Sequence, residues 1–244
     1  VVLFEQGDVS GAIEQYEVAL QRDPQFYNAL GNLGLALLEL GRSGEAGSCL
    51  QYAAQLAPDD PDVLANLATA YRQQGQTEQA ANAYRQAMLI RPDNGIAVKL
   101  ATLLPVIPSS RLDMEISRER FETEIDRLTR DGVSLTDPYR DVGVTQFHLS
   151  YHDANNRDLA RKVATLYRNS SPLLDYTAPH CAEPHGFSEG RIPSGRRIKV
   201  GFISRYFKNH AVGWCYQGVL RLMPRNRISV TAFTFGVGRD AVWD

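Results

Sequence analysis

The chain has 244 residues, of which 43% are hydrophobic, and a formal net charge of −2. This apolar content is ordinary for one or two folded globular domains, and the small net charge excludes a molecule that is basic throughout, as many nucleic-acid-binding proteins are. No apolar run approaches the roughly 20 residues that cross a bilayer. Neither a nucleic acid nor a membrane is therefore expected as a partner.

Charge is unevenly distributed along the chain. Residues 1–94 carry 12 acidic and 5 basic side chains, whereas residues 95–244 carry 16 acidic and 21 basic ones. The basic excess gathers from Arg191 onward. A phosphate-bearing small molecule would suit this end of the chain better than the other, although solvated surface charge is the commoner reason for such a pattern.

The three cysteines, Cys49, Cys181 and Cys215, lie far apart in the sequence. They form neither a disulfide framework nor the spacing of a zinc site. We therefore expect a reducing compartment and predict a cytoplasmic location.

Proline marks an internal repeat in the first part of the chain. Pro24, Pro58 and Pro92 are equally spaced and define a 34-residue period. Other residues recur at fixed offsets before these prolines: Gly7, Gly41 and Gly75; Ala12, Ala46 and Ala80; Tyr16, Leu50 and Tyr84; Ala19, Ala53 and Ala87. Such a period predicts stacked helix pairs in which small residues occupy the close crossings, glycine ends the first helix and proline follows the second.

This pattern resembles the tetratricopeptide repeat, and it predicts an α-helical solenoid at residues 1–94. Residues 27–60 and 61–94 are complete copies, and residues 1–26 are a copy without its first eight positions. Because a single repeat cannot bury its apolar face, residues 1–4 should expose core side chains, and we expect a longer array in the native protein.

Asn32 and Asn66 occupy equivalent positions, one period apart, in the first helix of each complete repeat. In this repeat family the first helices line the concave face. An amide both donates and accepts hydrogen bonds, so a row of asparagines can hold the backbone of an extended peptide whatever its sequence. The alternative is that each asparagine ties one helix to the next.

Residues 95–190 are predicted to form a helical linker. One helix should begin at a cap on Ser109 or Ser110 and end at Gly132, with an apolar stripe formed by Leu112, Ile116, Phe121, Ile125 and Leu128. A second helix should follow Asn156, with a stripe formed by Leu159, Val163 and Leu166. This helical bridge would set the angle of the array against the segment that follows.

The linker also contains most of the histidines. His148 and His152 are four residues apart, and His180 and His185 flank Cys181. Zinc needs three or four converging ligands, and a proline interrupts the second group. Structural hydrogen bonding or packing is favoured, and no metal site is expected.

Residues 191–244 are predicted to begin an α/β domain. "RRIKVGFIS" is typical of a strand buried on both faces, "ISVTAFTF" of a second strand, and the helix between them should carry Val212, Cys215, Val219 and Leu222 on one face. A right-handed crossover would make the strands parallel. Ligands bind beyond the carboxyl ends of such strands, where His210 follows the first one. Its imidazole can accept a proton near neutral pH, although a cap or surface role is commoner for a lone histidine in such a loop.

The repeats, the linker segments "LATLLPVIP" and "FHLSYHDANNRDLARKVATLYR", and "RRIKVGFISRYFKNHAVG" together resemble glycosyltransferase family 41. The resemblance covers the whole chain. It implies the first, Rossmann-like half of a GT-B fold in residues 191–244, a nucleotide-sugar donor, and no cofactor or metal. It also implies that His210 lies on the acceptor side of the catalytic site as the base, and that Asn32 and Asn66 hold acceptor peptides. Lys208 and Arg205 are candidate neighbours for a phosphate or the acceptor, or else face solvent.

The resemblance implies an inverting protein O-glycosyltransferase that transfers N-acetylglucosamine from UDP-GlcNAc to serine or threonine. GDP-fucose in a SPINDLY-like enzyme, and UDP-glucose with an asparagine acceptor, are alternatives within the same fold. A non-enzymatic scaffold for protein–protein interaction is an alternative from a different class. The donor-binding half would lie beyond Asp244, so we expect this chain alone to be inactive.

Overall fold

The computed structural model describes residues 2–177, 179, 197–204, 207 and 211–234. The chain divides into two compact units, Val1–Tyr176 and Thr177–Asp244. Each is described separately below.

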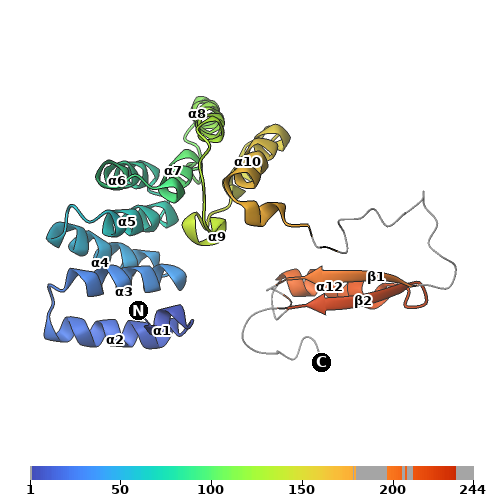
Figure 1. The fold of residues 1–244 in the computed structure, drawn as a ribbon, viewed down its shortest axis with the longest axis horizontal. Helices are drawn as coiled ribbons and strands as arrows, with labels where there is room; N and C mark the ends of the chain where they lie inside the picture. The colour runs from blue at the N-terminus through green and yellow to red at the C-terminus, as the bar shows by residue number, and fades with distance from the viewer. Residues whose placement is uncertain (1, 178, 180–196, 205–206, 208–210, 235–244) are drawn as a thin grey trace. The chain divides into compact units, whose positions relative to one another are not determined.

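Successive helix pairs build the first part of the first unit (Figure 1). Each predicted pair is present, and each proline at the 34-residue period follows shortly after the second helix of its pair, as expected. The helices are α1 (Val2–Glu5), α2 (Val9–Arg22), α3 (Tyr27–Glu39), α4 (Ser43–Leu56), α5 (Pro61–Gln73) and α6 (Thr77–Ile90).

The repeated glycines form the turns inside the pairs. Gly7, Gly41 and Gly75 have φ angles of 85°, 73° and 76°, a region that costs glycine nothing and other residues about 1–2 kcal/mol. The amide that follows each glycine donates to a carbonyl five residues earlier, as in the bond of 2.9 Å from Arg42 to Leu37. Glycine therefore ends each first helix in the way that the period predicts.

Small side chains occupy the helix crossings. Ala46, Ala53, Ala80 and Ala87 are fully buried, and the large residues at the remaining repeated position fill the space beside them. Gly34 illustrates how closely the helices approach, because a Cβ atom added there would overlap the side chain of the fully buried Leu50.

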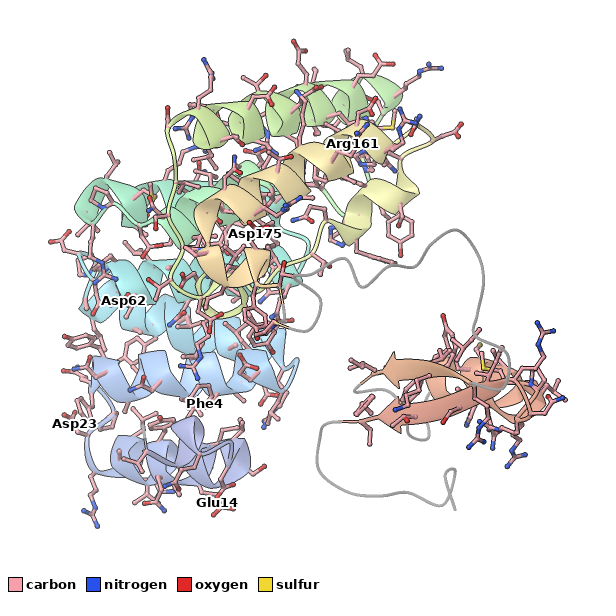
Figure 2. The ribbon with its side chains drawn as sticks, turned by 45° about the vertical axis from the view of Figure 1, so that its right-hand side comes forward. Phe4, Glu14, Asp23, Asp62, Arg161 and Asp175 are labelled. Carbon is pink, nitrogen blue, oxygen red and sulfur yellow. The ribbon has the colours of Figure 1, made fainter. Side chains whose placement is uncertain are left out.

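The N-terminal helix exposes less core than its sequence predicts. Val2 is 65% exposed, but Leu3 and Phe4 pack partly against the core formed by α2, α3 and α4 (Figure 2). The expectation is wrong for these two side chains because the short helix α1, which carries them, packs against α2.

A second core fills the remainder of this unit. This part comprises α7 (Asn94–Ala101), α8 (Arg111–Arg130), α9 (Pro138–Asp141), the 3₁₀ helix η1 (Phe147–Tyr151), α10 (Arg157–Ser170) and the 3₁₀ helix η2 (Pro172–Asp175). The buried side chains of the core come from α7, α8, η1, α10 and the loops between them. Ser110 caps α8 by accepting a bond of 3.1 Å from the amide of Asp113, and Gly132 follows its end with a φ of 68°. The predicted bounds of α8 and the start of α10 are confirmed.

The predicted apolar stripe of α8 is half right. Phe121, Ile125 and Leu128 are buried, but Leu112 and Ile116 are 64% and 56% exposed. At about 100° per residue, Leu112 and Ile116 lie on the side of the helix opposite the other three, so one face cannot carry all five. The stripe of α10 is confirmed, since Leu159, Val163 and Leu166 are all buried.

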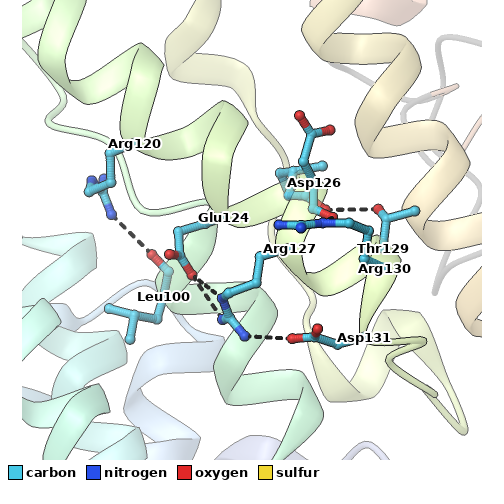
Figure 3. Close-up of polar contacts among 9 residues, drawn as sticks. Leu100, Arg120, Glu124, Asp126, Arg127, Thr129, Arg130 and Asp131 are labelled. Atoms are coloured by element: carbon cyan, nitrogen blue, oxygen red, sulfur yellow. Dashed lines mark hydrogen bonds and ion pairs between the residues drawn. The ribbon is translucent and has the colours of Figure 1, made fainter.

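Two cationic side chains fasten α8 to its neighbours. Arg120 donates to the carbonyl oxygen of Leu100 near the end of α7 (Figure 3) and to that of Leu103 just after this helix. Lys162 of α10 pairs with Glu122 at 2.9 Å and Asp126 at 2.5 Å. These contacts join α7, α8 and α10 into one body.

In the second unit, β1 (Ile198–Ile203), α12 (Ala211–Leu222) and β2 (Ile228–Phe233) form the predicted β–α–β arrangement. The strands are parallel, with Ile198 opposite Ile228 and Ile203 opposite Phe233. Among the described residues this is a two-stranded sheet, so the Rossmann-like start is supported only to that extent.

The expected burial of this unit is wrong. No residue of either strand is fully buried, and several are exposed, including Ile203 at 70% and Phe233 at 52%. On α12, Cys215, Val219 and Leu222 of the predicted stripe are exposed, whereas Leu220 is buried; the side chain of Val212 lies outside the described ones. A single helix covers only one face of a two-stranded sheet, and α12 packs through Leu220 instead of through its more apolar side.

Glycine-to-alanine changes should lower stability at a helix crossing but not on the solvent-facing side of a helix. We expect Gly34→Ala to lower the free energy of unfolding by about 1–3 kcal/mol, because Leu50 cannot move aside without strain. Gly44→Ala is the matched control, since its Cβ would meet nothing within 4 Å, and its stability should be unchanged or higher by up to about 1 kcal/mol. Urea unfolding followed by circular dichroism measures both, and equal effects would contradict the packing described here.

Candidate functional site

Asn32 and Asn66 lie at equivalent positions of α3 and α5, the first helices of two successive pairs. Their neighbours Leu33 and Leu67 point into the core and are 7% exposed each. The two amides are half-buried, at the boundary between this core and solvent. The same face of each first helix therefore presents an amide, and we call it the first-helix face.

Neither amide has a hydrogen-bond partner in the part of the chain that the structure describes. Other side chains tie the helix pairs together: Gln74 donates to the carbonyl of Ser43 at 2.7 Å, and Gln51 donates to the hydroxyl of Tyr71 at 3.1 Å. The donors and the acceptor of both asparagines are thus available to a ligand.

Helix α7 extends the first-helix face beyond the second repeat. Leu100 lies one period after Asn66 and packs partly against the core, so the row of asparagines does not continue. Lys99 precedes it on α7 and is half-buried. Burial lowers the pKa of Lys99, and the nearby charge of Arg72 lowers it further.

A polar group surrounds Arg72 on α5. The hydroxyls of Thr69 and Tyr84 lie 3.0 Å apart, and Tyr84 also interacts with Arg72. Burial raises the pKa of Tyr84, and these two contacts oppose that rise. Nε of Arg72 is buried and has no hydrogen-bond partner in the described residues.

Sequence reasoning missed this basic pair. Arg72 lies outside the motif positions of the repeat, and Lys99 follows Pro92, in a segment that begins like a first helix but does not continue into a complete repeat. The available signal was the repeat period itself, which places Lys99 at the position equivalent to Ala65 and Gly31 on the first-helix face.

A separate open hollow of about 650 Å³ lies among α4, α5 and α6. Its lining includes Leu64, Tyr71 and the exposed side chains of Leu89 and Ile90. Neither Asn32 nor Asn66 lines it.

The residues predicted for catalysis lie outside the described residues. His210, Lys208 and Arg205 all belong to the segment between the end of β1 at Ile203 and the start of α12 at Ala211. Their placement stays a prediction.

The linker histidines are in different surroundings. His148 lies within the 3₁₀ helix η1 and stacks on Tyr151 at 6.4 Å between ring centroids. His152 is 3% exposed, and its Nδ1 lies 3.4 Å from the guanidinium of Arg118. Arg118 in turn donates to Asn156 at 2.6 Å, so His152 belongs to a contact between α8 and the start of α10.

The other candidate ligands, His180, Cys181 and His185, lie outside the described residues. Within the described ranges, no three His, Cys, Asp or Glu side chains are placed to hold a metal ion. The same ranges contain no helix with the length and hydropathy of a membrane span.

Comparison with known families matches residues 2–61 and 43–104 to models of the tetratricopeptide repeat. The repeats predicted from the sequence period are thereby confirmed. A search of curated proteins finds no match.

Among solved structures, a mutant O-GlcNAc transferase of Thermobaculum terrenum is similar, with a TM-score of 0.53 and 18% identity over 98% of this chain. This chain covers only 36% of that one, and an identity so low shows a shared fold alone. MamA covers 71% of this chain with a TM-score of 0.48 and 17% identity, and 95% of its own chain is matched. A thermophilic TPR protein of Thermus thermophilus covers 68% with a TM-score of 0.43 and 15% identity, and 76% of its chain is matched.

The buried His152 should make the first unit sensitive to acid. Burial lowers its pKa, and the charges of Arg118 and His148 lower it further. The unfolded chain, with a histidine pKa of about 6.5, then binds a proton that the folded chain does not. The stability contributed by neutral His152 is therefore full above about pH 6.5 and is lost as the pH falls toward the lower folded-state value.

We expect the thermal unfolding midpoint to fall on acidification from about pH 7.5 to about pH 5.5, and to fall less in the variant His152→Gln. His148→Gln is the comparison variant and should keep most of the dependence of the parent, because it removes only the smallest of the three causes that lower the pKa of His152. An unaltered pH profile in His152→Gln would show that another group is responsible.

Proposed function

We propose that the first-helix face binds an extended polypeptide segment, and that this chain is the acceptor-binding part of a protein O-glycosyltransferase. The observation that carries the first statement is the pair of unpartnered amides of Asn32 and Asn66, held at equivalent places of successive helix pairs. An extended peptide has unpaired N–H and C=O groups along its backbone, and each amide can bond one of each.

Binding through the backbone suits an enzyme that modifies many proteins. The amides select for extended conformation and leave the side chains of the bound segment free. A serine or threonine can then be presented to a catalytic site without a requirement on its neighbours. Holding the hydroxyl near that site lowers the entropic cost of the reaction.

The transfer step is supported by the sequence resemblance and by the fold shared with an O-GlcNAc transferase. In the proposed reaction the acceptor oxygen forms a bond to the anomeric carbon of N-acetylglucosamine, and the bond from that carbon to the phosphate oxygen breaks. UDP leaves with the electron pair. The imidazole of His210 takes the hydroxyl proton. Lys208 and Arg205 lie close to His210 in the sequence, and their positive charges would stabilise a bound phosphate.

The family matches favour a second candidate. They extend over residues 2–104, the repeats and the first helix after them. A non-enzymatic scaffold that recruits partner proteins would need only these repeats and no catalytic domain. GDP-fucose in place of UDP-GlcNAc remains the alternative donor within the enzyme hypothesis.

Alanine at either asparagine should weaken peptide binding. We expect Asn32→Ala and Asn66→Ala each to raise the Kd of an extended, labelled peptide about tenfold, because each removes hydrogen bonds to its backbone. Asn82→Ala is the control, since this exposed asparagine lies on α6, the second helix of its pair, and pairs with Arg85. Fluorescence anisotropy measures the Kd of the three variants. An equal rise in Kd in Asn82→Ala would contradict the assignment of Asn32 and Asn66 to peptide binding.

Transfer is tested in the complete gene product with radiolabelled nucleotide sugars. We expect incorporation from UDP-GlcNAc into an acceptor protein, and a loss of about 10²–10⁴-fold in His210→Ala. His148→Gln should retain the parent rate. No incorporation from any donor would favour the scaffold, and full activity of His210→Ala would remove the proposed base.

A further inference from the structure

The open hollow among α4, α5 and α6 is built by helices of two successive repeats. Its buried lining includes Leu64 and Leu67 of α5, which are 5% and 7% exposed, and its exposed lining includes Leu89 and Ile90 of α6. Its volume of about 650 Å³ lies within the range of pockets that hold ligands. The hollow therefore has room for apolar side chains of a partner.

A difference between equivalent residues explains why this hollow is open. Ala54 lies at the position that Leu20 occupies one period earlier. Leu20 packs against the cores that contain Leu30 and Leu33, which are the equivalents of the two buried leucines of the hollow. The methyl group of Ala54 is too short to cover its own leucines in the same way. A small residue thus stands where the preceding repeat has a large one.

The exposed edge of the hollow shows a second difference. Leu89 is 85% exposed, although Gln21 and Gln55 occupy the equivalent positions of the preceding repeats. Ile90 beside it is 42% exposed. Single exposed apolar residues are ordinary, but here they adjoin an apolar hollow and form a contiguous patch with it, and such patches mark interaction sites.

An acidic hollow adjoins the apolar one. It has a volume of about 490 Å³, is lined by Asp59, Asp60 and Asp62, and shares Asp59 with the first hollow. Asp60 accepts bonds of 2.9 and 3.1 Å from amides at the start of α5, and Asp62, labelled in Figure 2, pairs with Arg91. The exposed side chain of Asp59 has no such partner in the part of the chain that the structure describes. A positive charge on a partner would therefore meet Asp59 beside the apolar hollow.

The charge of the array also indicates what kind of partner fits. Residues 1–94 carry 12 acidic and 5 basic side chains, so a second copy of the array would be repelled and a basic partner attracted. The walls of the hollow are helices, whose backbone groups are bonded within each helix, so recognition depends on side chains. An amphipathic helix that lays its apolar face into a groove is the mode of peptide binding that meets this condition.

We propose that this hollow, which we call the second-helix hollow, docks a short amphipathic helix of a partner protein. The apolar side chains of that helix would cover Leu64 and Leu67, and a lysine or arginine would lie beside Asp59. This docking site goes beyond the proposed function, because neither Asn32 nor Asn66 lines the hollow. Apolar contacts supply most of the affinity, whereas an exposed ion pair changes Kd only about two- to fivefold.

Labelled helical peptides of one length test this site with the whole chain. Their apolar face carries leucine, phenylalanine or serine, and the neighbouring position carries lysine, glutamine or glutamate. We expect the leucine and phenylalanine peptides to bind at least about tenfold more tightly than the serine peptides. Among them, lysine should improve Kd about threefold over glutamine. Fluorescence anisotropy measures each Kd.

Variants that restore the residues of the preceding repeats assign this binding to the hollow. Ala54→Leu fills the hollow and should raise Kd about tenfold, and Leu89→Gln should raise it about fivefold. Ala54→Leu should keep or raise the thermal unfolding midpoint, because the repeat accommodates Leu20 at the equivalent position. Leu112→Gln is the matched control, since this leucine of α8 is 64% exposed and lies outside the hollow, and its Kd should equal that of the parent.

A separate pair of variants tests the charge. Asp59→Asn should remove the preference for lysine over glutamine and leave the binding of the glutamine peptides unchanged. Glu14→Gln removes an exposed carboxylate of α2 that does not line the hollow, and it should keep the preference.

Four results would overturn the inference. The first is that no peptide of the set binds, and the second is an equal Kd in the parent, Ala54→Leu and Leu89→Gln. The third is displacement by the extended peptide used to test Asn32 and Asn66, which would place the binding on the first-helix face. The fourth is self-association of the parent, measured by analytical ultracentrifugation, that Ala54→Leu abolishes, because a second copy would then occupy the hollow.

Discussion

The repeat array depends on how closely its helices approach one another. Ala46, Ala53, Ala80 and Ala87 are fully buried at the crossings, where a larger side chain would push the helices apart. Leu50 then fills the space that Gly34 leaves open, and a small and a large residue again meet at the equivalent places of the next repeat. Because each crossing is alike, each first helix presents the same face, and residues one period apart lie on one surface.

This constraint explains why equivalent residues of successive repeats can act together. Asn32 and Asn66 lie where the core meets solvent, so their amides are oriented by the helix, and they have no hydrogen-bond partner among the described residues. Under the proposed function, this pair of amides suits any extended backbone.

The linker shows a different use of charge. Arg120 satisfies carbonyl oxygens at the end of α7, and Lys162 joins α10 to α8 through two carboxylates. Both contacts connect segments that are distant in sequence: the first holds α8 on α7, and the second holds α10 on α8. The buried His152 beside Arg118 adds a contact at the start of α10 that holds best when the imidazole is neutral.

Local patterns in the sequence determined the helix pairs, the glycine turns, the cap at Ser110 and the parallel strands, since each of these depends on neighbours in the chain or on a strict period. Tertiary structure alone decided that Leu112 and Ile116 face away from the core and that α12 packs through Leu220. Which residues are buried or paired depends on which surfaces, distant in sequence, pack together. Inside the array the repeat period determines this packing, and after Pro92 it no longer does.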